Sequence, residues 1–130
     1  MHVYLMRHGI AYEQSEWSGG DDSRPLTGEG MQRTRAVAKA LYKAGKLDLA
    51  EVWTSPLVRA RQTAEIVAEV LDAPMKECAA MAPGACVEGL AKFFAKNRPP
   101  ERFMLVGHEP DMGALLSELH KTKEAIHFKK

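Results

Sequence analysis

Two histidines and two arginines lie at positions where a folded chain of this pattern would present them to a ligand. His8 and His108 each follow an apolar, strand-prone run, and Arg7 directly precedes His8. Arg59 lies a few residues after a third such run. Guanidinium groups are bidentate donors that match the geometry and offset the charge of a phosphoryl group, and a neutral imidazole is a competent nucleophile. The set predicts phosphoryl transfer through a phosphohistidine.

The two imidazoles would have different tasks in such a transfer. Neighbouring cations lower the pKa of an imidazole and keep its lone pair available at neutral pH, which suits His8 as the nucleophile. His108, with backbone N–H groups at the start of the helix expected from Pro110, would stabilise the charge that develops in flight. Two histidines without a positioned Asp, Glu or Cys make a poor zinc site, so neither a metal nor a cofactor is expected.

Each of these residues also has a purely structural alternative. Arg7-His8-Gly9 by itself is equally compatible with a strand that ends in surface polar residues, although Gly9 would permit a sharp turn and a close approach to a ligand. Arg59 could be a surface arginine on a helix. Arg61 points away from Arg59 at helical spacing, and the structural alternative is favoured for it. His108 repeats the strand, glycine and histidine pattern of His8, which argues for function.

The surrounding pattern alternates strands with helices. Strands are expected at residues 3–6, 49–54 and 102–106, with a short extended piece at 75–78 and a possible last strand at 125–128. Helices are expected at 27–45, 56–71, 87–97 and from 110 onward. This order indicates an α/β protein, a three-layer α/β/α sandwich with a mainly parallel central sheet. In such folds ligands bind at the carboxyl ends of the strands, where the four candidate residues lie.

Local signals mark where the helices begin and which faces are buried. Thr27 is expected to cap the first helix, and Ser55 to cap the second, with Pro56 in its first turn. In the first helix Met31, Thr34, Ala38, Leu41 and Tyr42 are predicted to face inward. The polar segment 10–25 is expected to be a loop over the strand ends, with Trp17 more often a packing residue than a lid anchor and Arg24 a possible guide for an anionic partner.

Composition sets the limits of these predictions. The chain has 130 residues, 45% hydrophobic and 27% charged, with a net charge of +1, which suits one globular domain spanning residues 1–130 and gives no general argument for nucleic acid or membrane. Cys78 and Cys86 do not resemble a zinc or disulfide framework, and free thiols are expected. With no leader or long apolar run, the protein is expected to be soluble and cytoplasmic.

Four motifs in order resemble the histidine phosphatase superfamily, also called the phosphoglycerate mutase-like family, and most of all its SixA-type phosphohistidine phosphatases. They are Leu5-Met6-Arg7-His8-Gly9, Leu26-Thr27-Gly28-Glu29-Gly30, the stretch from Thr54 to Thr63, and Leu105-Val106-Gly107-His108-Glu109-Pro110. The resemblance implies that His8 is transiently phosphorylated, that Arg7, Arg59 and His108 form the phosphate pocket, joined by Gly9 and Arg24, and that water hydrolyses the intermediate.

The chain departs from this family at one point. Many relatives have a carboxylate general acid in the region of residues 79–84, where this chain has none. Five other carboxylates are conceivable proton donors, although for each of them a solvated surface side chain is the favoured interpretation: Glu13, Glu77, Glu88, Glu109 and Asp111. Imidazole is a better leaving group than an alkoxide, so the missing acid favours phosphohistidine in a protein, such as a histidine phosphotransfer domain, over sugar phosphates.

Two alternatives remain open from the sequence. One is a small-molecule phosphomonoesterase or mutase of the same superfamily, acting on a small phosphorylated metabolite. The other, from a different class, is a phosphate- or phosphoprotein-binding module without turnover, against which the intact Arg7, His8, Arg59 and His108 argue.

Overall fold

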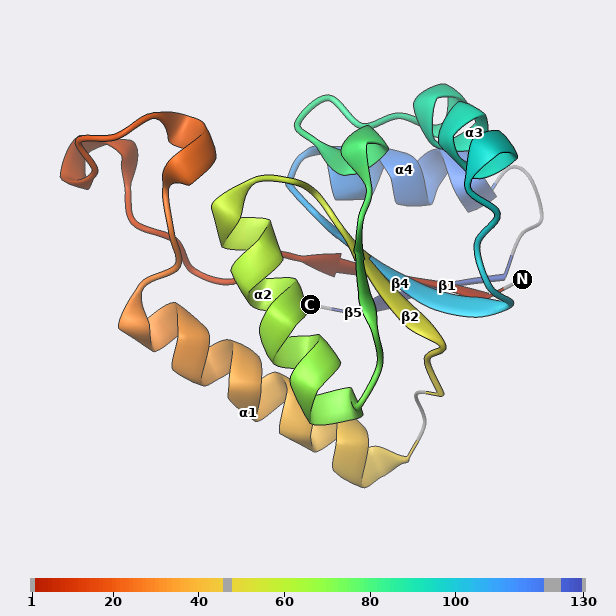
Figure 1. Ribbon diagram of the computed structural model, residues 1–130, viewed down its shortest axis with the longest axis horizontal. Coiled ribbons are helices and arrows are strands. Elements are labelled where there is room, and N and C mark those ends of the chain that lie inside the picture. Colours follow the sequence, from red (N-terminus) through yellow and green to blue (C-terminus); the bar gives the residue numbers. More distant parts are fainter. Residues whose placement is uncertain (1, 46–47, 121–124, 130) are drawn as a thin grey trace.

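A computed structural model describes residues 2–45, 48–120 and 125–129. Within these ranges the chain forms a parallel sheet of five strands in the order β3-β2-β4-β1-β5 (Figure 1). The strands are β1 (His2–Arg7), β2 (Glu51–Thr54), β3 (Met75–Glu77), β4 (Arg102–Gly107) and β5 (Ala125–Lys129). The helices are α1 (Gly28–Ala44), α2 (Val58–Leu71), α3 (Val87–Lys96) and α4 (Asp111–His120), with 3-10 turns η1 (Gln14–Glu16), η2 (Asp21–Ser23) and η3 (Ala79–Met81).

The helices cover both faces of the sheet, which confirms the predicted three-layer α/β/α architecture. From β1 to β2 to β3 the chain moves toward one edge of the sheet, and from β3 to β4 to β5 it moves toward the other. Crossover connections between parallel strands are almost always right-handed, so the two directions of travel place their helices on opposite faces. Accordingly α1 and α2 lie on one side of the sheet, and α3 and α4 lie on the other (Figure 1).

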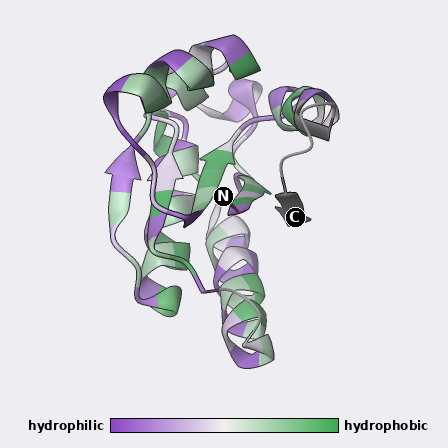
Figure 2. Cartoon of the chain, turned by 90° about the vertical axis from the view of Figure 1, so that its right-hand side faces the viewer, coloured by the Kyte–Doolittle hydropathy of each residue, from purple (hydrophilic) through white to green (hydrophobic). Residues whose placement is uncertain are grey.

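Alternate side chains of the central strands supply two separate cores. Val3 and Leu5 of β1 pack in the cluster that includes α3 and α4, whereas Tyr4 and Met6 pack in the cluster that includes α1 and α2. Successive side chains of a strand point to opposite faces, so a strand that is covered on both sides is apolar throughout. Figure 2 shows hydrophobic residues on the central strands between the helix layers.

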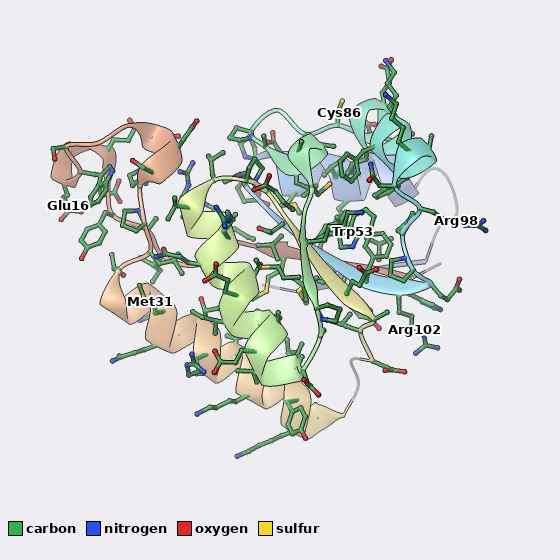
Figure 3. The ribbon with its side chains drawn as sticks, in the orientation of Figure 1. Glu16, Met31, Trp53, Cys86, Arg98 and Arg102 are labelled. Atoms are coloured by element: carbon green, nitrogen blue, oxygen red, sulfur yellow. The ribbon has the colours of Figure 1, made fainter. Side chains whose placement is uncertain are left out.

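An aromatic cluster fills the core under α3. Trp53 of β2 is 1% exposed, and its ring lies 5.4 to 5.8 Å from those of Phe93, Phe94 and Phe103 (Figure 3). Pairs at this separation add stabilisation beyond the area they bury. The cluster anchors α3 to the middle of the sheet and so fixes the connection that returns the chain to β4.

The register of the strands aligns the carboxyl ends of three of them, β1, β4 and β2. Arg7 of β1 is opposite Gly107 of β4, and the N–H of the next residue, His8, donates to the carbonyl of Gly107 at 3.0 Å. On the other side of β4, the N–H of Ser55 donates to the carbonyl of Val106 at 3.0 Å. The ends of β1, β4 and β2 therefore deliver their following residues to one place.

The inward face of α1 differs from the prediction. Thr34 and Ala38 are buried as expected, but Met31 is 38% exposed and Tyr42 is 64% exposed. Gly30, Thr34, Val37, Ala38 and Leu41 form one continuous stripe, and at about 100° per residue Met31 and Tyr42 fall on its flank. The cap was predicted correctly, since Thr27 Oγ1 accepts the N–H of Gly30 at 2.9 Å.

The start of α2 also differs. The helix begins at Val58, with Leu57 in extended conformation before it, so Ser55 is not its cap and Pro56 lies outside it. Ser55 instead uses its hydroxyl to accept the N–H of Leu57 at 3.2 Å and to bond a histidine of the site. The Ser55 hydroxyl therefore bonds a histidine from a distant part of the chain and does not cap α2, although the local pattern predicts that it would.

The remaining elements lie close to where they were expected. α4 begins at Asp111, one residue after the predicted start at Pro110, and buries Met112 and Leu115. Helical spacing predicts that Leu119 also faces inward, but its side chain lies outside the described residues. β5 pairs in parallel with β1, which confirms the last predicted strand. None of the helices in the described part of the chain is long and apolar enough to cross a membrane.

The contact between the loop after β1 and the start of α1 predicts a steric test. A Cβ on Gly30 would lie 2.1 Å from the carbonyl oxygen of Ile10, whereas a Cβ on Gly28 meets nothing within 4 Å. We expect Gly30→Ala to lower the free energy of unfolding by about 1–3 kcal/mol, because backbone would have to move. Gly28→Ala should change it by less than about 0.5 kcal/mol or stabilise the helix. Urea unfolding measures both, and equal effects would contradict the packing described.

Candidate active site

His8 lies immediately after β1 with one ring nitrogen held by the protein. Its Nδ1 lies 2.7 Å from the carbonyl oxygen of Gly9. A carbonyl only accepts hydrogen bonds, so Nδ1 carries the proton and Nε2 keeps its lone pair. Burial lowers the pKa of His8, the bond to Gly9 partly offsets this, and the charges of Arg59, Arg7 and Arg24 lower it further. The ring is therefore neutral at pH 7, with Nε2 available as a nucleophile.

Thr63 connects the end of β1 to α2. Its hydroxyl accepts the N–H of Gly9 at 3.0 Å and donates to the carbonyl of Arg59 at 2.8 Å. Helical spacing predicts that Arg59 and Thr63, four residues apart, share one face of the helix, and the bond between them confirms it. The same spacing does not predict the contact of Thr63 to Gly9. Both polar backbone groups of Gly9 are bonded within the protein, and its carbonyl holds the His8 ring. The contact of Gly9 to substrate stays a prediction.

His108 is 5% exposed and lies against His8, with ring centroids 5.2 Å apart and an interplanar angle of 60°. Its Nε2 lies 2.8 Å from Oγ of Ser55, which already accepts the N–H of Leu57. No other acceptor for the Ser55 hydroxyl proton is found among the described residues, so we assign that proton to the bond with Nε2, which places the His108 proton on Nδ1. That Nδ1 is buried and has no hydrogen-bond partner among the described residues. With this tautomer, Nδ1–H is a hydrogen-bond donor left free beside His8.

The His108 ring is held neutral by its surroundings. Burial, followed by the nearby His8 and Arg59, lowers the pKa of His108 to about 4, and the carboxylates of Asp111 and Asp21 only partly oppose this. A neutral ring with a fixed Nδ1–H can donate one hydrogen bond without adding charge to the resting site.

Arg59, on the first turn of α2, is buried although it is charged. It is 5% exposed, its Nη1 donates to the carbonyl of Asp21 at 2.8 Å, and its Nη2 lies 3.2 Å from Asp21 Oδ2. Its Nε is buried and has no hydrogen-bond partner in the described part of the chain. Arg61 is exposed, as its helical position predicted. The buried arginine thus keeps a free N–H edge in the neighbourhood of both histidines.

Arg7 and Arg24 act on the site from its outer side. Arg7 has an exposed side chain at the end of β1, and its charge lowers the pKa of His8. Arg24 donates to Oδ1 of Asp21 from Nη2 at 2.9 Å and also to the carbonyl of Tyr12. Arg24 is therefore tied within the covering loop in this structure.

The loop that covers the strand ends is packed by its own side chains. Trp17 stacks on Tyr12 with ring centroids 6.3 Å apart, and its indole N–H donates to Ser23 Oγ at 3.2 Å. This agrees with the packing role favoured for Trp17. The loop is joined to α2 where the N–H of Leu26 donates to Gln62 Oε1 at 2.7 Å.

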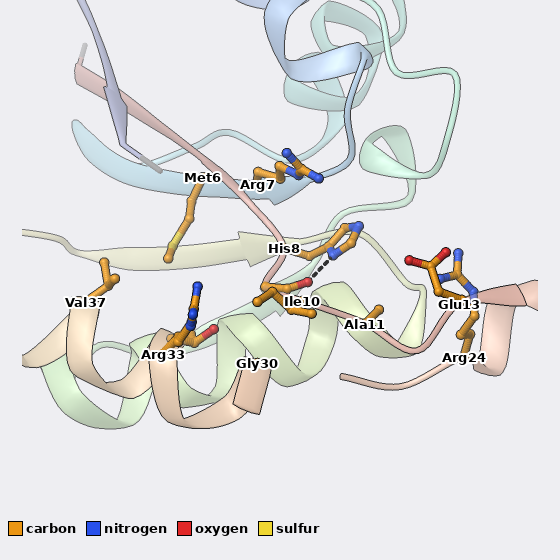
Figure 4. A pocket seen from close by; sticks show the side chains of 12 residues that line it. Met6, Arg7, His8, Ile10, Ala11, Glu13, Arg24, Gly30, Arg33 and Val37 are labelled. Atoms are coloured by element: carbon orange, nitrogen blue, oxygen red, sulfur yellow. Dashed lines mark hydrogen bonds between the residues drawn. The ribbon is translucent and has the colours of Figure 1, made fainter. Parts of the chain in front are cut away.

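A cavity of about 540 Å³ opens beside His8 on the α1 side of β1 (Figure 4). In Figure 4, Met6 and Val37 lie at one end of it and Glu13 and Arg24 at the other. Arg7 and Arg33 also line it. The cavity therefore presents cationic side chains next to His8, while Arg59 and His108 are not among the residues that line it.

The other candidate carboxylates lie on the surface or have backbone partners. Glu77, Glu88 and Glu109 are exposed, and Asp111 Oδ2 accepts the N–H of Gly84 at 2.7 Å. Glu13 is exposed as well, but it is the carboxylate that lines the cavity with His8. Among the described residues no three His, Cys, Asp or Glu side chains converge on a possible metal position, and Cys78 and Cys86 are free thiols.

Sequence reasoning missed three residues of this site. Asp21, Ser55 and Thr63 each bond directly to a predicted site residue or its neighbour. The signal for Ser55 and Thr63 was their place in the same stretch as Arg59, but their local patterns suggested a cap and a helix face. No local signal distinguishes Asp21 from its neighbour Asp22.

Comparison with known proteins assigns this fold and site to a family. A family model described as the histidine phosphatase superfamily (branch 1) matches residues 3–112. The chain belongs to the histidine phosphatase superfamily. This confirms the resemblance expressed by the four motifs and the phosphoglycerate mutase-like fold.

Similar proteins within the family include phosphohistidine phosphatases. The chain is 32% identical over 123 residues to phosphohistidine phosphatase SixA of Escherichia coli K12, covering 92% of this chain and 74% of SixA. It is 41% identical over 118 residues to an uncharacterized protein of Picosynechococcus sp., covering 87% of this chain and 69% of that one. A structure of the protein histidine phosphatase SixA with tungstate matches at a TM-score of 0.77 and 30% identity, covering 90% and 75% of the two chains. Family membership and these similarities support phosphatase activity.

The environment of His108 predicts a pH-dependent stability. A pKa of about 4 in the folded state and about 6.5 in the unfolded state means that the unfolded chain binds the extra proton first. The contribution of His108 is therefore fully present above about pH 6.5 and is lost as the pH falls toward 4, by at most roughly 3 kcal/mol. Urea unfolding at pH 7 and pH 4.5 should show a smaller loss in His108→Gln than in the unsubstituted protein. Equal losses would contradict this environment.

The hydrogen bond from Ser55 predicts the tautomer of His108. Ser55→Ala removes the donor to Nε2 and the acceptor of the Leu57 N–H, so we expect a loss of about 1–3 kcal/mol in stability. We also expect the His108 ring, which is an Nδ1–H tautomer in the unsubstituted protein, to become a mixture. Nitrogen-15 chemical shifts of the imidazole report the tautomer directly. An unsubstituted protein with the Nε2–H tautomer would overturn the assignment.

Proposed function

We propose that the protein is a phosphatase that forms a covalent phosphohistidine on His8 and takes its phosphate from phosphohistidine in a protein partner. The observation that carries the proposal is the convergence of three groups, each with one free polar position. These are the lone pair on His8 Nε2, the unpaired Nδ1–H of His108 and the unpaired Nε–H of Arg59. A phosphoryl group needs a nucleophile and charge-offsetting donors at this kind of spacing.

In the first step His8 Nε2 attacks phosphorus, and the bond from phosphorus to the leaving nitrogen breaks. His108 and Arg59 donate to the oxygens of the transferring group, and Arg7 adds positive charge from the open side. The leaving imidazole takes a proton from solvent. In the second step water attacks phosphorus, the P–N bond to His8 breaks and inorganic phosphate leaves. This route requires no metal.

The charge state of the site supports His8 as the nucleophile. Its lowered pKa keeps the ring neutral at pH 7, because burial and three arginines disfavour the cation. When the phosphoryl group arrives, its negative charge meets arginines that are already in place. The relative solved with tungstate, an oxyanion with tetrahedral geometry like that of phosphate, also supports an oxyanion pocket here.

The leaving group is the basis for choosing phosphohistidine. Residues 79–84 contain no carboxylate, and Asp111, which lies near them, is bonded to Gly84. An alkoxide leaving group needs a positioned general acid, which is typically worth about 10²- to 10⁴-fold, whereas imidazole needs far less help. We propose a phosphorylated protein as the partner, a histidine phosphotransfer domain being one candidate, and the cytoplasm as its location. The name of the relative SixA supports this choice.

A second candidate is a phosphomonoesterase for a small metabolite. It is favoured by the cavity beside His8, because Glu13 lines that cavity and is a carboxylate near the nucleophile. In this case Arg7, Arg24 and Arg33 would contact further anionic groups of the substrate. A binding module without turnover is the remaining alternative, and it would use the same donors.

A turnover panel tests the proposal. We expect a phosphohistidine protein to be hydrolysed faster than a simple alkyl phosphate by about 10²-fold or more, with an aryl phosphate between them. His8→Ala should remove turnover, and Arg59→Ala should lower kcat/KM by roughly 10²- to 10³-fold, because a donor to the transferring group is lost. Arg61→Ala, on the exposed side of the same helix, is the matched control and should be unaffected.

The outcomes separate the candidates. Trapping of phosphate on the peptide containing His8, detected by mass spectrometry under alkaline conditions, would identify the intermediate. Unchanged activity in His8→Ala would end the covalent mechanism. Equal rates for alkyl phosphates and phosphohistidine would favour the small-molecule alternative, and vanadate binding without hydrolysis of any substrate would favour the binding module.

A further inference from the structure

Asp21, in the covering loop, makes the contacts that hold the side chain of Arg59. Its backbone carbonyl accepts from Arg59 Nη1 at 2.8 Å, and its Oδ2 accepts from Arg59 Nη2 at 3.2 Å. Its other carboxylate oxygen, Oδ1, accepts from Arg24 Nη2 at 2.9 Å and Nε at 3.2 Å, and from Gln14 Nε2 at 3.3 Å. The single carboxylate thus bridges two arginines that are far apart in the sequence.

The atoms involved decide which edge of Arg59 remains free. A guanidinium has two usable edges, one formed by both Nη groups and one formed by Nε and the adjacent Nη2 proton. Asp21 occupies the edge formed by both Nη groups, with its carbonyl and its carboxylate. Nε is buried, and none of the residues that the structure describes bonds to it. The second edge therefore stays available for two parallel bonds to a phosphoryl group.

We propose that Asp21 is a positioning residue of the phosphatase site, which fixes the guanidinium of Arg59 so that its Nε edge faces the transferring phosphoryl group. This inference rests on the proposed function and identifies a residue in the covering loop on which the site depends. Asp21 does not contact the substrate. It acts through Arg59, and Arg24 acts in turn through Asp21.

A competing role for the same carboxylate would be to occupy the phosphate position. The edge assignment argues against it, because Arg59 can hold Asp21 and a phosphoryl group at the same time through different edges. The burial of Arg59 supports positioning as well. A buried guanidinium with one edge unpaired keeps its orientation only if its other edge is bonded, and Asp21 provides every bond to the side chain of Arg59 found among the described residues.

The charge of Asp21 is present at every pH at which the enzyme would work. The hydrogen bonds from Arg24 and then Gln14, with the charge of Arg59, lower the pKa of Asp21 to about 2. A depressed pKa means that its ion-pair contribution is present above about pH 4 and is lost only as the pH falls toward 2. Removing the charge by substitution is therefore the appropriate test.

The test compares Asp21→Asn with Asp22→Asn, its exposed neighbour in the same turn. Both variants remove one negative charge, but only Asp21 bonds Arg59. We expect Asp21→Asn to lower kcat by about 10- to 100-fold, because misplacement of a functional group by about 1 Å costs up to 10²-fold. Its dissociation constant for vanadate should rise about 10-fold. Asp22→Asn should match the unsubstituted protein in both measurements.

A double-substitution cycle tests the link through Arg24. When introduced alone, Arg24→Ala should lower kcat. When introduced into the Asp21→Asn variant, it should have little further effect, because the effects of residues that act through one another are not additive. Additive losses would mean that Arg24 contacts the substrate independently. That result would remove Arg24 from the proposed chain of contacts and overturn this part of the proposal.

Vanadate affinity separates this proposal from the proposed function. If the unsubstituted protein turns over no substrate but binds vanadate, the function fails while weaker binding by Asp21→Asn still supports positioning. Tighter vanadate binding by Asp21→Asn with unchanged or higher kcat would show that the carboxylate competes with phosphate, and would overturn the proposal. Equal behaviour of the two Asn variants would overturn it too.

Discussion

The parallel register between β1 and β4 is the constraint on which the site depends. With Arg7 opposite Gly107, the next residue on each strand is a histidine, and the N–H of His8 donates to the carbonyl of Gly107. A shift of one residue would turn one of these rings toward a helix layer, because successive side chains point to opposite faces. The two apolar cores prevent such a shift, since each strand buries alternate side chains on both faces. Hydrophobic packing therefore fixes the distance between two polar rings.

The polar groups of the site share one arrangement. Each has one part bonded within the protein and one part free. His8 is held at Nδ1 by Gly9, His108 at Nε2 by Ser55, and Arg59 at its Nη groups by Asp21. Internal bonds of this kind fix orientation before a ligand arrives, so little reorganisation is needed when charge develops. Burial contributes separately, because it lowers the pKa of both histidines and keeps them neutral.

The covering loop has a larger part in this arrangement than its composition suggests. It is polar and exposed over most of its length, yet it provides the partners of a buried arginine and packs its own aromatic residues, Tyr12 and Trp17. Loops that carry functional contacts on a rigid scaffold are common in α/β proteins. Here the loop lies against α2 through Leu26 and Gln62 as well as through Asp21. The scaffold and the loop thus hold Arg59 from two sides.

The sequence by itself determined the α/β class and the order of its elements, and it predicted the four polar residues placed at the strand ends. These follow from short-range signals, namely apolar runs, helical spacing and the residues that follow each strand. The tertiary structure alone decided the free nitrogen on each histidine, the edge of Arg59 left unpaired, and the roles of Ser55, Thr63 and Asp21. It also showed that the side chains of Met31 and Tyr42 in α1 are exposed, and that Ser55 lies before α2 and does not cap it. The physical reason is that hydrogen bonds between segments tens of residues apart depend on strand order and helix position, which no local pattern encodes.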